Sequence, residues 1–430
     1  MPDYVKILPE SIANQIAAGE VIQRPSSAVK ELLENAIDAG STEIKVVIKD
    51  AGKTLIQIID NGCGMSKKDA QLCFDRHATS KIKKIDDLFS IKTMGFRGEA
   101  LASIASIAQV ELRTKEHDQE LGTEAHIAGS KITKNEACTC PNGSTISIKN
   151  LFYNVPARRN FLKSNPVETK HIIEEFQRVS MANPNIHFEL IHNGVQIYHL
   201  GEGNLRQRLV QILGKNYNER LIPLEEGTDI VKINGFIGKP DSAKKTRGDQ
   251  FFFVNKRFIK SPYLHHAVMQ AFENILPKGH YPFYCIMLEI DPDKIDINVH
   301  PTKQEIKFQD DKLLYTILSA VIKSSLGKFN ITPSLDFEGS NELDHFLAEP
   351  RPQPIGTTGY ITRPSKMDQG NYKSNVNISG WEDLLEVQKE DIEINIEEDG
   401  SKSYSLAPDW DNNSIPNEEK SWMQIHNSYI

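Results

Sequence analysis

Apolar residues recur at regular spacings along the first 330 residues and lose that regularity afterwards. Between Pro25 and Gly40 they fall three and four positions apart, which predicts an amphipathic helix with Pro25-Ser26-Ser27 as N-cap and Gly40 as stop. The same reasoning predicts further helices over 205–213 and 313–322 and strands over 55–59, 251–254 and 284–290. Helices and strands mix without a regular βαβ rhythm, so the expected fold class is α+β.

The pattern changes twice along the chain. A soft boundary lies near Gly201-Glu202-Gly203-Asn204, where an alternation of helical and strand patterns ends. After Ile331 the sequence becomes rich in Pro, Asn, Ser and acidic residues, and such a composition buries too little surface to offset the entropy of ordering. We therefore expect one domain over residues 1–204, a second over 205–330, and a disordered acidic tail over 331–430.

Composition narrows the class of protein. A chain of 430 residues is too long for one core, and it has no run of about twenty apolar residues that would span a membrane. Residues 1–6 lack a basic stretch followed by an apolar core, so secretion is not expected. Cys138 and Cys140 are separated by one residue and have no second pair, so a zinc site is not expected either. These features predict a reduced, cytoplasmic protein.

The charge is divided unevenly. Residues 331–430 hold 7 Lys and Arg against 19 Asp and Glu, so the net charge of −8 divides into −12 for the tail and +4 for the rest. A mildly basic body is compatible with a nucleic-acid partner. Basic residues beside aromatic ones are candidates for contact with DNA phosphates, with ordinary surface charge as the alternative. They are Arg158, Arg159, Lys256, Arg257 and Lys260.

Three polar residues of the first predicted helix are candidates for binding a metal ion and activating a water molecule. Glu31, Asn35 and Asp38 stand at i, i+4 and i+7, so they share a face other than the apolar stripe. The carboxamide oxygen of Asn35 suits Mg²⁺, and the carboxylate of Glu31 suits orienting or deprotonating a water. For this helix taken alone, the alternative is an ordinary solvated face.

Two glycine-containing segments add to this picture. The predicted strand 55–59 runs into Asp60-Asn61-Gly62-Cys63-Gly64, which is either a plain turn or an aspartate that accepts a bond from a base amino group. In the second reading the glycines let a ligand approach. Gly95 and Gly98 precede a helix rich in Ala and Ser, where backbone N–H groups and a positive helix end favour a phosphate.

These three elements, in this order, resemble the GHKL ATPases, the superfamily of gyrase B, histidine kinases and the heat-shock chaperones of that fold. Within it, six stretches are similar to the MutL family of DNA mismatch repair proteins. They are LPESIANQIAAGEV (8–21), VKELLENAIDAG (29–40), RHATSKI (76–82), GFRGEAL (95–101), LFYNVPARR (151–159) and DINVHPTKQE (296–305). The resemblance implies a GHKL (Bergerat) α/β sandwich, then a smaller α+β domain of the ribosomal protein S5 domain 2-like fold.

The resemblance also implies ATP and Mg²⁺ as cofactors and assigns roles at matching positions. Glu31 matches the glutamate that activates the hydrolytic water, Asn35 matches the Mg²⁺ ligand, and Lys303 matches a lysine that reaches the γ-phosphate from the second domain. Asp60 matches the aspartate that reads adenine. The other implied nucleotide contacts are Gly62, Gly64, Thr79, Ser80, Lys81, Gly95, Phe96, Arg97, Gly98, Ser144 and Thr145.

The chain departs from the family pattern in three places. Lys256 stands where glycine is common, on a turn-like stretch, so we expect no harm to the fold. Gly143-Ser144 replaces the usual Gly-Thr and keeps a hydroxyl group. The chain ends at Ile430, inside what resembles the family's flexible linker, so we expect this chain to lack the C-terminal dimerisation domain and any endonuclease site.

The function implied by the resemblance is ATP-dependent DNA mismatch repair. It includes slow ATP hydrolysis, closure and homodimerisation on ATP, sequence-independent DNA binding, and coupling of a MutS-type mismatch sensor to a downstream nuclease or helicase at the nucleoid. One alternative is a related GHKL topoisomerase subunit or kinase, which needs a cleavage or phosphoacceptor domain. Another is a nucleotide-free DNA-binding scaffold, which has no chemical need for Glu31, Asn35 and Lys303 together.

Overall fold

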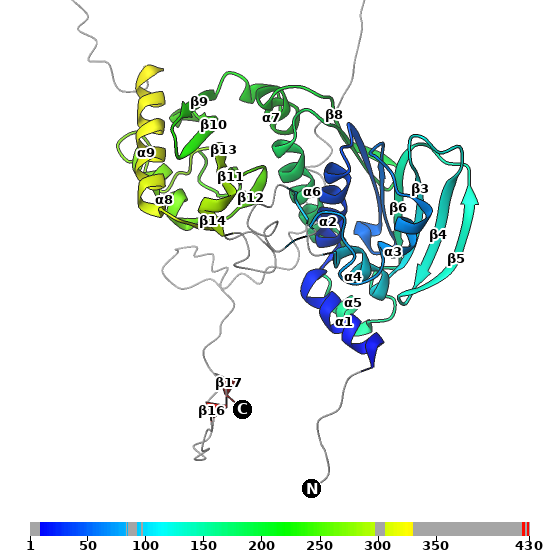
Figure 1. The fold of residues 1–430 in the computed structure, drawn as a ribbon. Coiled ribbons are helices and arrows are strands. Elements are labelled where there is room, and N and C mark those ends of the chain that lie inside the picture. The colour runs from blue at the N-terminus through cyan, green and yellow to red at the C-terminus, as the bar shows by residue number, and fades with distance from the viewer. Residues whose placement is uncertain are drawn as a thin grey trace, which may run out of the picture. The chain divides into compact units, whose positions relative to one another are not determined.

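The computed structural model describes residues 9–82, 84, 93–95, 98–296, 306–329, 424–425 and 428–429. The chain divides into two units, residues 1–351 and 352–430. In the second unit the structure describes two short antiparallel strands, β16 (Gln424–Ile425) and β17 (Ser428–Tyr429). Both larger sheets belong to the first unit (Figure 1).

The first sheet has eight strands in the order β5-β4-β3-β6-β2-β1-β7-β8. Every neighbouring pair is antiparallel except β1 and β7, which are parallel. The strands are β1 (Glu43–Lys49), β2 (Leu55–Asp60), β3 (Gln109–Lys115), β4 (Gly122–Ala128), β5 (Lys131–Cys138), β6 (Gly143–Lys149), β7 (His187–His192) and β8 (Val195–Leu200). In β1 and β2 buried residues alternate with more exposed ones, as expected for a sheet with one covered face.

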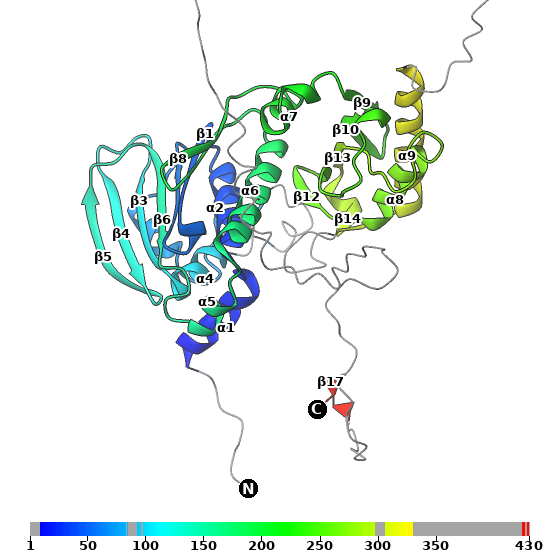
Figure 2. The same ribbon diagram turned by 180° about the vertical axis from the view of Figure 1, so that it is seen from behind.

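Six helices accompany this sheet: α1 (Glu10–Val21), α2 (Pro25–Asp38), α3 (Lys67–Leu72), α4 (Ala100–Ile107), α5 (Pro156–Phe161) and α6 (Asn165–Ala182). The apolar stripe of α2 packs against β2 and α6. Both views show α2 and α6 between the eight-stranded sheet and the second sheet (Figures 1 and 2). Helix α6 also contacts β12 of the second sheet, so the two sheets are connected through it.

The second sheet has five strands in the order β12-β11-β13-β10-β9. Its strands are β9 (Leu221–Gly227), β10 (Val231–Gly238), β11 (Gln250–Val254), β12 (Arg257–Ile259) and β13 (Tyr284–Ile290). Helices α8 (Pro262–Ala271) and α9 (Asp311–Lys328) pack together and share an apolar cluster with this sheet, while α7 (Leu205–Leu213) leads into it. A two-stranded ladder pairs β14 (Ile295–Asp296) with β15 (Lys307–Phe308).

The predicted α+β fold class is confirmed, and several predicted elements coincide with observed ones. The strand expected over 284–290 is β13, and the helix expected over 205–213 is α7. The start of α2 differs, because the helix begins at Pro25 with Arg24 as N-cap and no side-chain capping bond. Proline suits the first helical turn, where its missing N–H has no intrahelical partner, so the two serines lie inside the helix.

A buried arginine connects α7 to the first sheet. Arg208 is 1% exposed and donates hydrogen bonds to the carbonyl groups of Ser180, Pro184, Ile186 and Gly201 at 2.6–3.1 Å. Burial lowers the pKa of this guanidinium to about 10. Within the described part of the chain, no helix combines the length and apolar character needed to cross a bilayer.

Candidate nucleotide-binding site

Helix α2 presents the predicted polar constellation on the face that it does not bury. Leu32 and Leu33 are at most 1% exposed and belong to the core of the first sheet. Glu31 and Asn35 are half-buried, and the side chain of Asp38 is 7% exposed. The sequence spacing therefore predicted the shared face correctly.

Lys81 and Asp38 form the centre of a hydrogen-bonded network. Lys81 Nζ lies 3.0 Å from Asn35 Oδ1 and 2.5 Å from Asp38 Oδ2. The Asp38 carboxylate also accepts the backbone N–H groups of Met94, at 2.9 Å, and Gly95, at 3.0 Å. The structure thus unites three predicted residues, Asn35, Lys81 and Gly95, through Asp38. Sequence analysis placed Asp38 on this face but gave it no role.

Asp60 ends β2 in a buried position. Its Oδ1 accepts the N–H of Gly62 at 2.9 Å and the hydroxyl of Ser41 at 3.2 Å. Burial raises the pKa of Asp60 above its ordinary value, although the hydrogen bonds from Gly62, Ser41 and Ser144 act in the opposite direction. The Ser41 hydroxyl also lies 2.6 Å from the carbonyl of Ala36, so Asp60 is connected to the end of α2. A buried acceptor held in this way distinguishes an amino group from a carbonyl group.

Two predicted glycines allow close backbone approach. Gly64 has φ +71°, and a Cβ there would lie 2.1 Å from the carbonyl oxygen of Lys115 in β3. Gly98 has φ +63°, and a Cβ there would lie 2.4 Å from the carbonyl oxygen of Ala78. A side chain at either position would strain the backbone as well as clash. Gly98 therefore holds the start of α4 against the segment that carries Thr79.

Ser144 and Thr145, predicted together, point to opposite faces of the sheet. Ser144 pairs with Asp60 across β2 and β6, is buried, and has its hydroxyl 2.9 Å from that of Thr114. Thr145 is the next residue of β6 and lies opposite Arg113. Because side chains alternate along a strand, the side chain of Thr145 leaves the sheet on the face away from Asp60. Thr145 therefore lies apart from Asp60, and its assignment as a nucleotide contact stays a prediction.

The other predicted phosphate contacts are described in part. The N–H of Lys81 donates to Thr79 Oγ1 at 3.2 Å, which turns this short segment on itself. Ser80 is exposed beside it. The predictions for Phe96, Arg97 and Lys303 concern positions outside the described residues, so they stay predictions.

The carboxamide oxygen of Asn35 is a ligand type that suits a magnesium ion, whereas the Asp38 carboxylate is bonded to Lys81 and to two backbone N–H groups. A carboxamide oxygen of Asn35 and a carboxylate oxygen of Asp38 converge on one ammonium group, and hard cations prefer oxygen ligands of these kinds. Mg²⁺ is commonly bound by one or two protein carboxylates together with waters and substrate phosphates. Among the described residues there is no group of three or more His, Cys, Asp or Glu suited to a metal.

The basic residues proposed for DNA lie in different environments. Arg159, Lys256 and Lys260 are exposed. Arg158 is half-buried and donates to the carbonyl of Ile22 at 3.2 Å. The exposed three are therefore accessible to a phosphate backbone, whereas Arg158 already has a partner in the fold.

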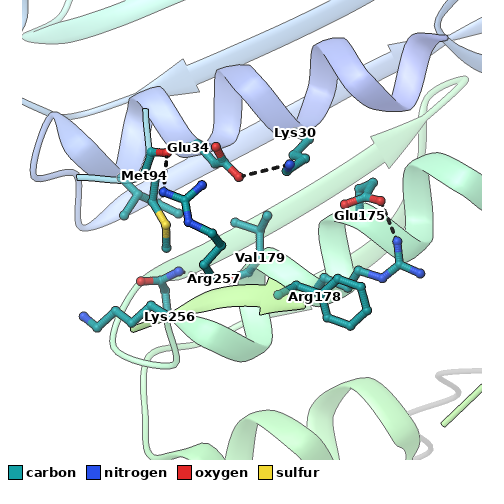
Figure 3. Close-up of a pocket in the computed structure, with 11 residues that line it drawn as sticks. Lys30, Glu34, Met94, Glu175, Arg178, Val179, Lys256 and Arg257 are labelled. Carbon is teal, nitrogen blue, oxygen red and sulfur yellow. Dashed lines mark hydrogen bonds and ion pairs between the residues drawn. The ribbon is translucent and has the colours of Figure 1, made fainter. Parts of the chain in front are cut away.

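The structure corrects the prediction for Arg257. This residue is 6% exposed, and its Nη2 donates to the carbonyl of Met94 at 2.8 Å and to that of Thr93 at 3.3 Å (Figure 3). A guanidinium buried in this way does not face solvent and is not available to DNA. Sequence analysis missed the contact because it joins positions 163 residues apart.

Comparisons with known proteins agree with this geometry. Residues 23–155 match the family described as histidine kinase-, DNA gyrase B- and HSP90-like ATPase, and residues 209–327 match the family described as DNA mismatch repair protein, C-terminal domain. The chain is 62% identical over 344 residues to the DNA mismatch repair protein MutL of Christiangramia forsetii, and 58% identical over 344 residues to that of Flavobacterium psychrophilum. The chain belongs to the MutL family. Each alignment covers 80% of this chain and 56% of the relative, so the chain spans about half the length of these MutL proteins.

Solved structures show the same fold. A structure described as the N-terminal domain of a DNA repair protein matches with a TM-score of 0.64 and 23% identity, covering 74% of this chain and 99% of that one. The ATPase domain of Aquifex aeolicus MutL, a mismatch repair endonuclease, matches with a TM-score of 0.50 and 21% identity, covering 71% of this chain and 100% of that one. Together with the family matches, they confirm the predicted GHKL-like fold of a MutL-family chain.

Proposed function

We propose that this chain binds ATP with Mg²⁺ and hydrolyses it as the ATPase region of a mismatch repair protein. The observation that carries the proposal is the convergence of Asn35, Asp38, Lys81 and Gly95 on one side of α2. Asp60, connected to the end of α2 through Ser41, supplies a buried acceptor for the adenine amino group. The match of residues 23–155 to an ATPase family supports the same assignment.

Each group has a distinct role in this proposal. Glu31, one turn before Asn35, orients and deprotonates the attacking water. Asn35 would hold Mg²⁺ through its carboxamide oxygen, while Asp38 keeps Lys81 in place; the ion, when bound, neutralises phosphate charge. Lys81, Thr79, Ser80 and the glycine-containing segments contact phosphates, because ammonium, hydroxyl and backbone N–H groups all donate to phosphate oxygens.

Substitution of Glu31 tests the hydrolytic role. Glu31→Ala should leave binding of an ATP analogue intact and reduce turnover by at least ~10²-fold, since a positioned base contributes that much. Glu43→Ala is a suitable control because Glu43 is an exposed carboxylate at the start of β1. Turnover of Glu31→Ala at the parental rate would remove Glu31 from its role. Asn35→Ala should instead lose Mg²⁺-dependent nucleotide binding.

Lys303 is proposed to contact the γ-phosphate from the second domain. Because ADP lacks that phosphate, Lys303→Ala should bind ADP normally, hydrolyse ATP slowly and close less on an ATP analogue. Lys303→Arg should restore activity only in part, since a planar guanidinium differs from a compact ammonium. Parental turnover by Lys303→Ala would show that this lysine takes no part in catalysis.

We further propose that the nucleotide controls association. The chain should be monomeric without nucleotide and should dimerise with a non-hydrolysable ATP analogue through the segment around Gly95–Gly98 and through α1. Ile12 and Ile16 support this surface, since they are 45% and 53% exposed on α1. Light scattering that shows a monomer at saturating analogue would count against this part of the proposal.

DNA binding is proposed to be independent of sequence. Contacts by exposed cations such as Arg159, Lys256 and Lys260 to phosphates should weaken steeply as salt rises. Removal of the acidic residues 331–430 should strengthen binding, and equal affinity with and without them at low salt would contradict the idea. By family membership we also propose a MutS-type mismatch sensor and a downstream nuclease or helicase as partners, which binding measurements with the purified proteins would test.

A further inference from the structure

The segment Thr93–Gly95 is held from two sides by opposite charges. On one side, the carboxylate of Asp38 accepts the N–H groups of Met94 and Gly95 at 2.9 and 3.0 Å. On the other side, Nη2 of Arg257 donates to the carbonyl groups of Thr93 and Met94 at 3.3 and 2.8 Å. Asp38 lies on α2, and Arg257 begins β12 of the second sheet, so the segment bridges the two.

The peptide group is the unit that makes this arrangement rigid. The carbonyl of Thr93 and the N–H of Met94 belong to one planar peptide, and the carbonyl of Met94 and the N–H of Gly95 belong to the next. Each of the two peptides therefore has its carbonyl bound by a cation and its N–H bound by an anion. Hydrogen bonds arranged in such chains polarise and strengthen one another where water is excluded.

Asp38 and Arg257, the two ends of this row of hydrogen bonds, are shielded from solvent. The side chain of Asp38 is 7% exposed and Arg257 is 6% exposed. Figure 3 shows Arg257 reaching from β12 to Met94 beneath α2, beside a cavity of about 20 Å³ that Met94 and Arg257 help to line. A buried guanidinium is costly unless it is hydrogen-bonded. Nη2 of Arg257 has two carbonyl acceptors, whereas the buried Nη1 has no partner.

The hairpin that carries Arg257 is itself anchored. Asn255, in the loop between β11 and β12, exchanges two hydrogen bonds with the backbone of Ile290 at 2.8 and 3.0 Å. Its own N–H donates to the carbonyl of Leu288 at 2.9 Å. The position of Arg257 is therefore set by the centre of the second sheet, through β13.

We infer that Arg257 is a positioning residue for the candidate nucleotide site. By fixing two consecutive peptides, it sets where Asp38 is held, and Asp38 in turn holds Lys81 beside Asn35. The second domain thereby determines the position of the ammonium proposed to bind phosphate, beside the Asn35 oxygen proposed to bind Mg²⁺. This inference rests on the proposed ATPase function and extends it to a residue outside the ATPase family match, which ends at residue 155.

Amide exchange in the nucleotide-free protein tests the link directly. Arg257→Met keeps an apolar stem and removes Nη2, the donor of both hydrogen bonds. Exchange of the Met94 and Gly95 amides should therefore accelerate by about tenfold. Arg257→Lys keeps one donor group and should give an intermediate rate. Lys232→Gln, a change of an exposed lysine on β10 of the same sheet, should leave both amides unchanged. Urea denaturation of Arg257→Met and Arg257→Lys checks that both variants are folded before their exchange rates are compared.

A double-mutant cycle distinguishes a shared network from general loosening. Asp38→Asn should also accelerate exchange at the same two amides. Since both substitutions act on the same peptides, their combined effect should be smaller than the product of the single effects. A combined effect equal to the product of the two single effects would show that Asp38 and Arg257 are not coupled, and it would overturn the inference.

Nucleotide affinity supplies the functional arm. With Mg²⁺, the Kd of a non-hydrolysable ATP analogue should rise about tenfold in Arg257→Met, less in Arg257→Lys, and not in Lys232→Gln. If the parent binds the analogue and Arg257→Met binds it equally well, the positioning role is wrong while the proposed function stands. If the parent itself does not bind the analogue, the proposed function fails and the positioning role fails with it. Faster amide exchange with parental affinity would likewise overturn the inference.

Discussion

Asp60→Asn separates nucleotide recognition from protein stability. The substitution keeps the size of the side chain and one oxygen that can accept the N–H of Gly62. It replaces the other carboxylate oxygen with an amino group, which donates hydrogen bonds and cannot accept one from adenine. The proposed contact to the adenine amino group is therefore lost, because the side-chain amide NH₂ and the adenine amino group are both donors.

The expected loss of affinity follows from the kind of hydrogen bond removed. A bond to a charged acceptor contributes about 1.5–3 kcal/mol, which corresponds to a loss of about 10- to 150-fold in ATP affinity. Stability should respond differently, because burial raises the pKa of Asp60 above 3.8. The folded state then binds this proton more readily than the unfolded state, so stability decreases as pH rises from 3.8 through the raised pKa. Asp60→Asn removes this dependence and should not lower the free energy of unfolding at neutral pH by more than about 1 kcal/mol.

The assay compares ATP with inosine triphosphate, which has a carbonyl where ATP has the amino group. The parent should prefer ATP, and Asp60→Asn should lose that preference. Ser41→Ala is the matched control, because it removes one donor to Asp60 and keeps the carboxylate. If Asp60→Asn retains the parental preference for ATP, Asp60 does not read the base. Urea denaturation at pH 4 to 8 measures the stability of parent and variant.

Two further predictions concern stability. Lys256 has φ +66° and follows Asn255 at φ +48° in the two-residue loop between β11 and β12, where glycine is favoured. Lys256→Gly should therefore raise the free energy of unfolding by about 1 kcal/mol. An unchanged denaturation midpoint would show that the backbone at Lys256 is not strained. Arg208→Met should lower the free energy of unfolding by about 3–5 kcal/mol, because four carbonyl groups lose their donor. They are those of Ser180, Pro184, Ile186 and Gly201. A loss under about 1 kcal/mol would show that water replaces the guanidinium.

The sequence predicts features that depend on residues close together in the chain better than features that depend on distant residues. Helical spacing alone placed Glu31, Asn35 and Asp38 on one face, because i, i+4 and i+7 positions are fixed by helix geometry. Strand alternation would also have separated Ser144 from Thr145, but the family motif led both to be assigned to the site. The start of α2 was placed too late because the serines were assigned a capping role, although the preceding proline already suits the first helical turn.

Contacts between residues far apart in the chain leave no local sequence pattern that would predict them. Arg257 has the same local sequence features as an exposed DNA-binding residue, with Lys256 and Phe258 beside it. Only the packing of the second sheet against the segment Thr93–Gly95 makes it a buried donor. The role of Asp38 was missed for the same reason, since its partners Met94 and Gly95 lie 56 and 57 positions away.

The bonds of Arg208 also affect how such a chain can be recombined. Leu209 and Ile212 of α7 share the apolar cluster of the first sheet, as do Phe253 and Cys285 of the second. A chimaera joined at residue 204 would take its arginine from one parent and the four carbonyl acceptors from the other. Exchange of the second domain between relatives should therefore keep residues 205–213 with the first domain, and even then Phe253 and Cys285 would have to match the new neighbours. Substitutions at this junction should therefore be tolerated only when the residues on both sides of it change together.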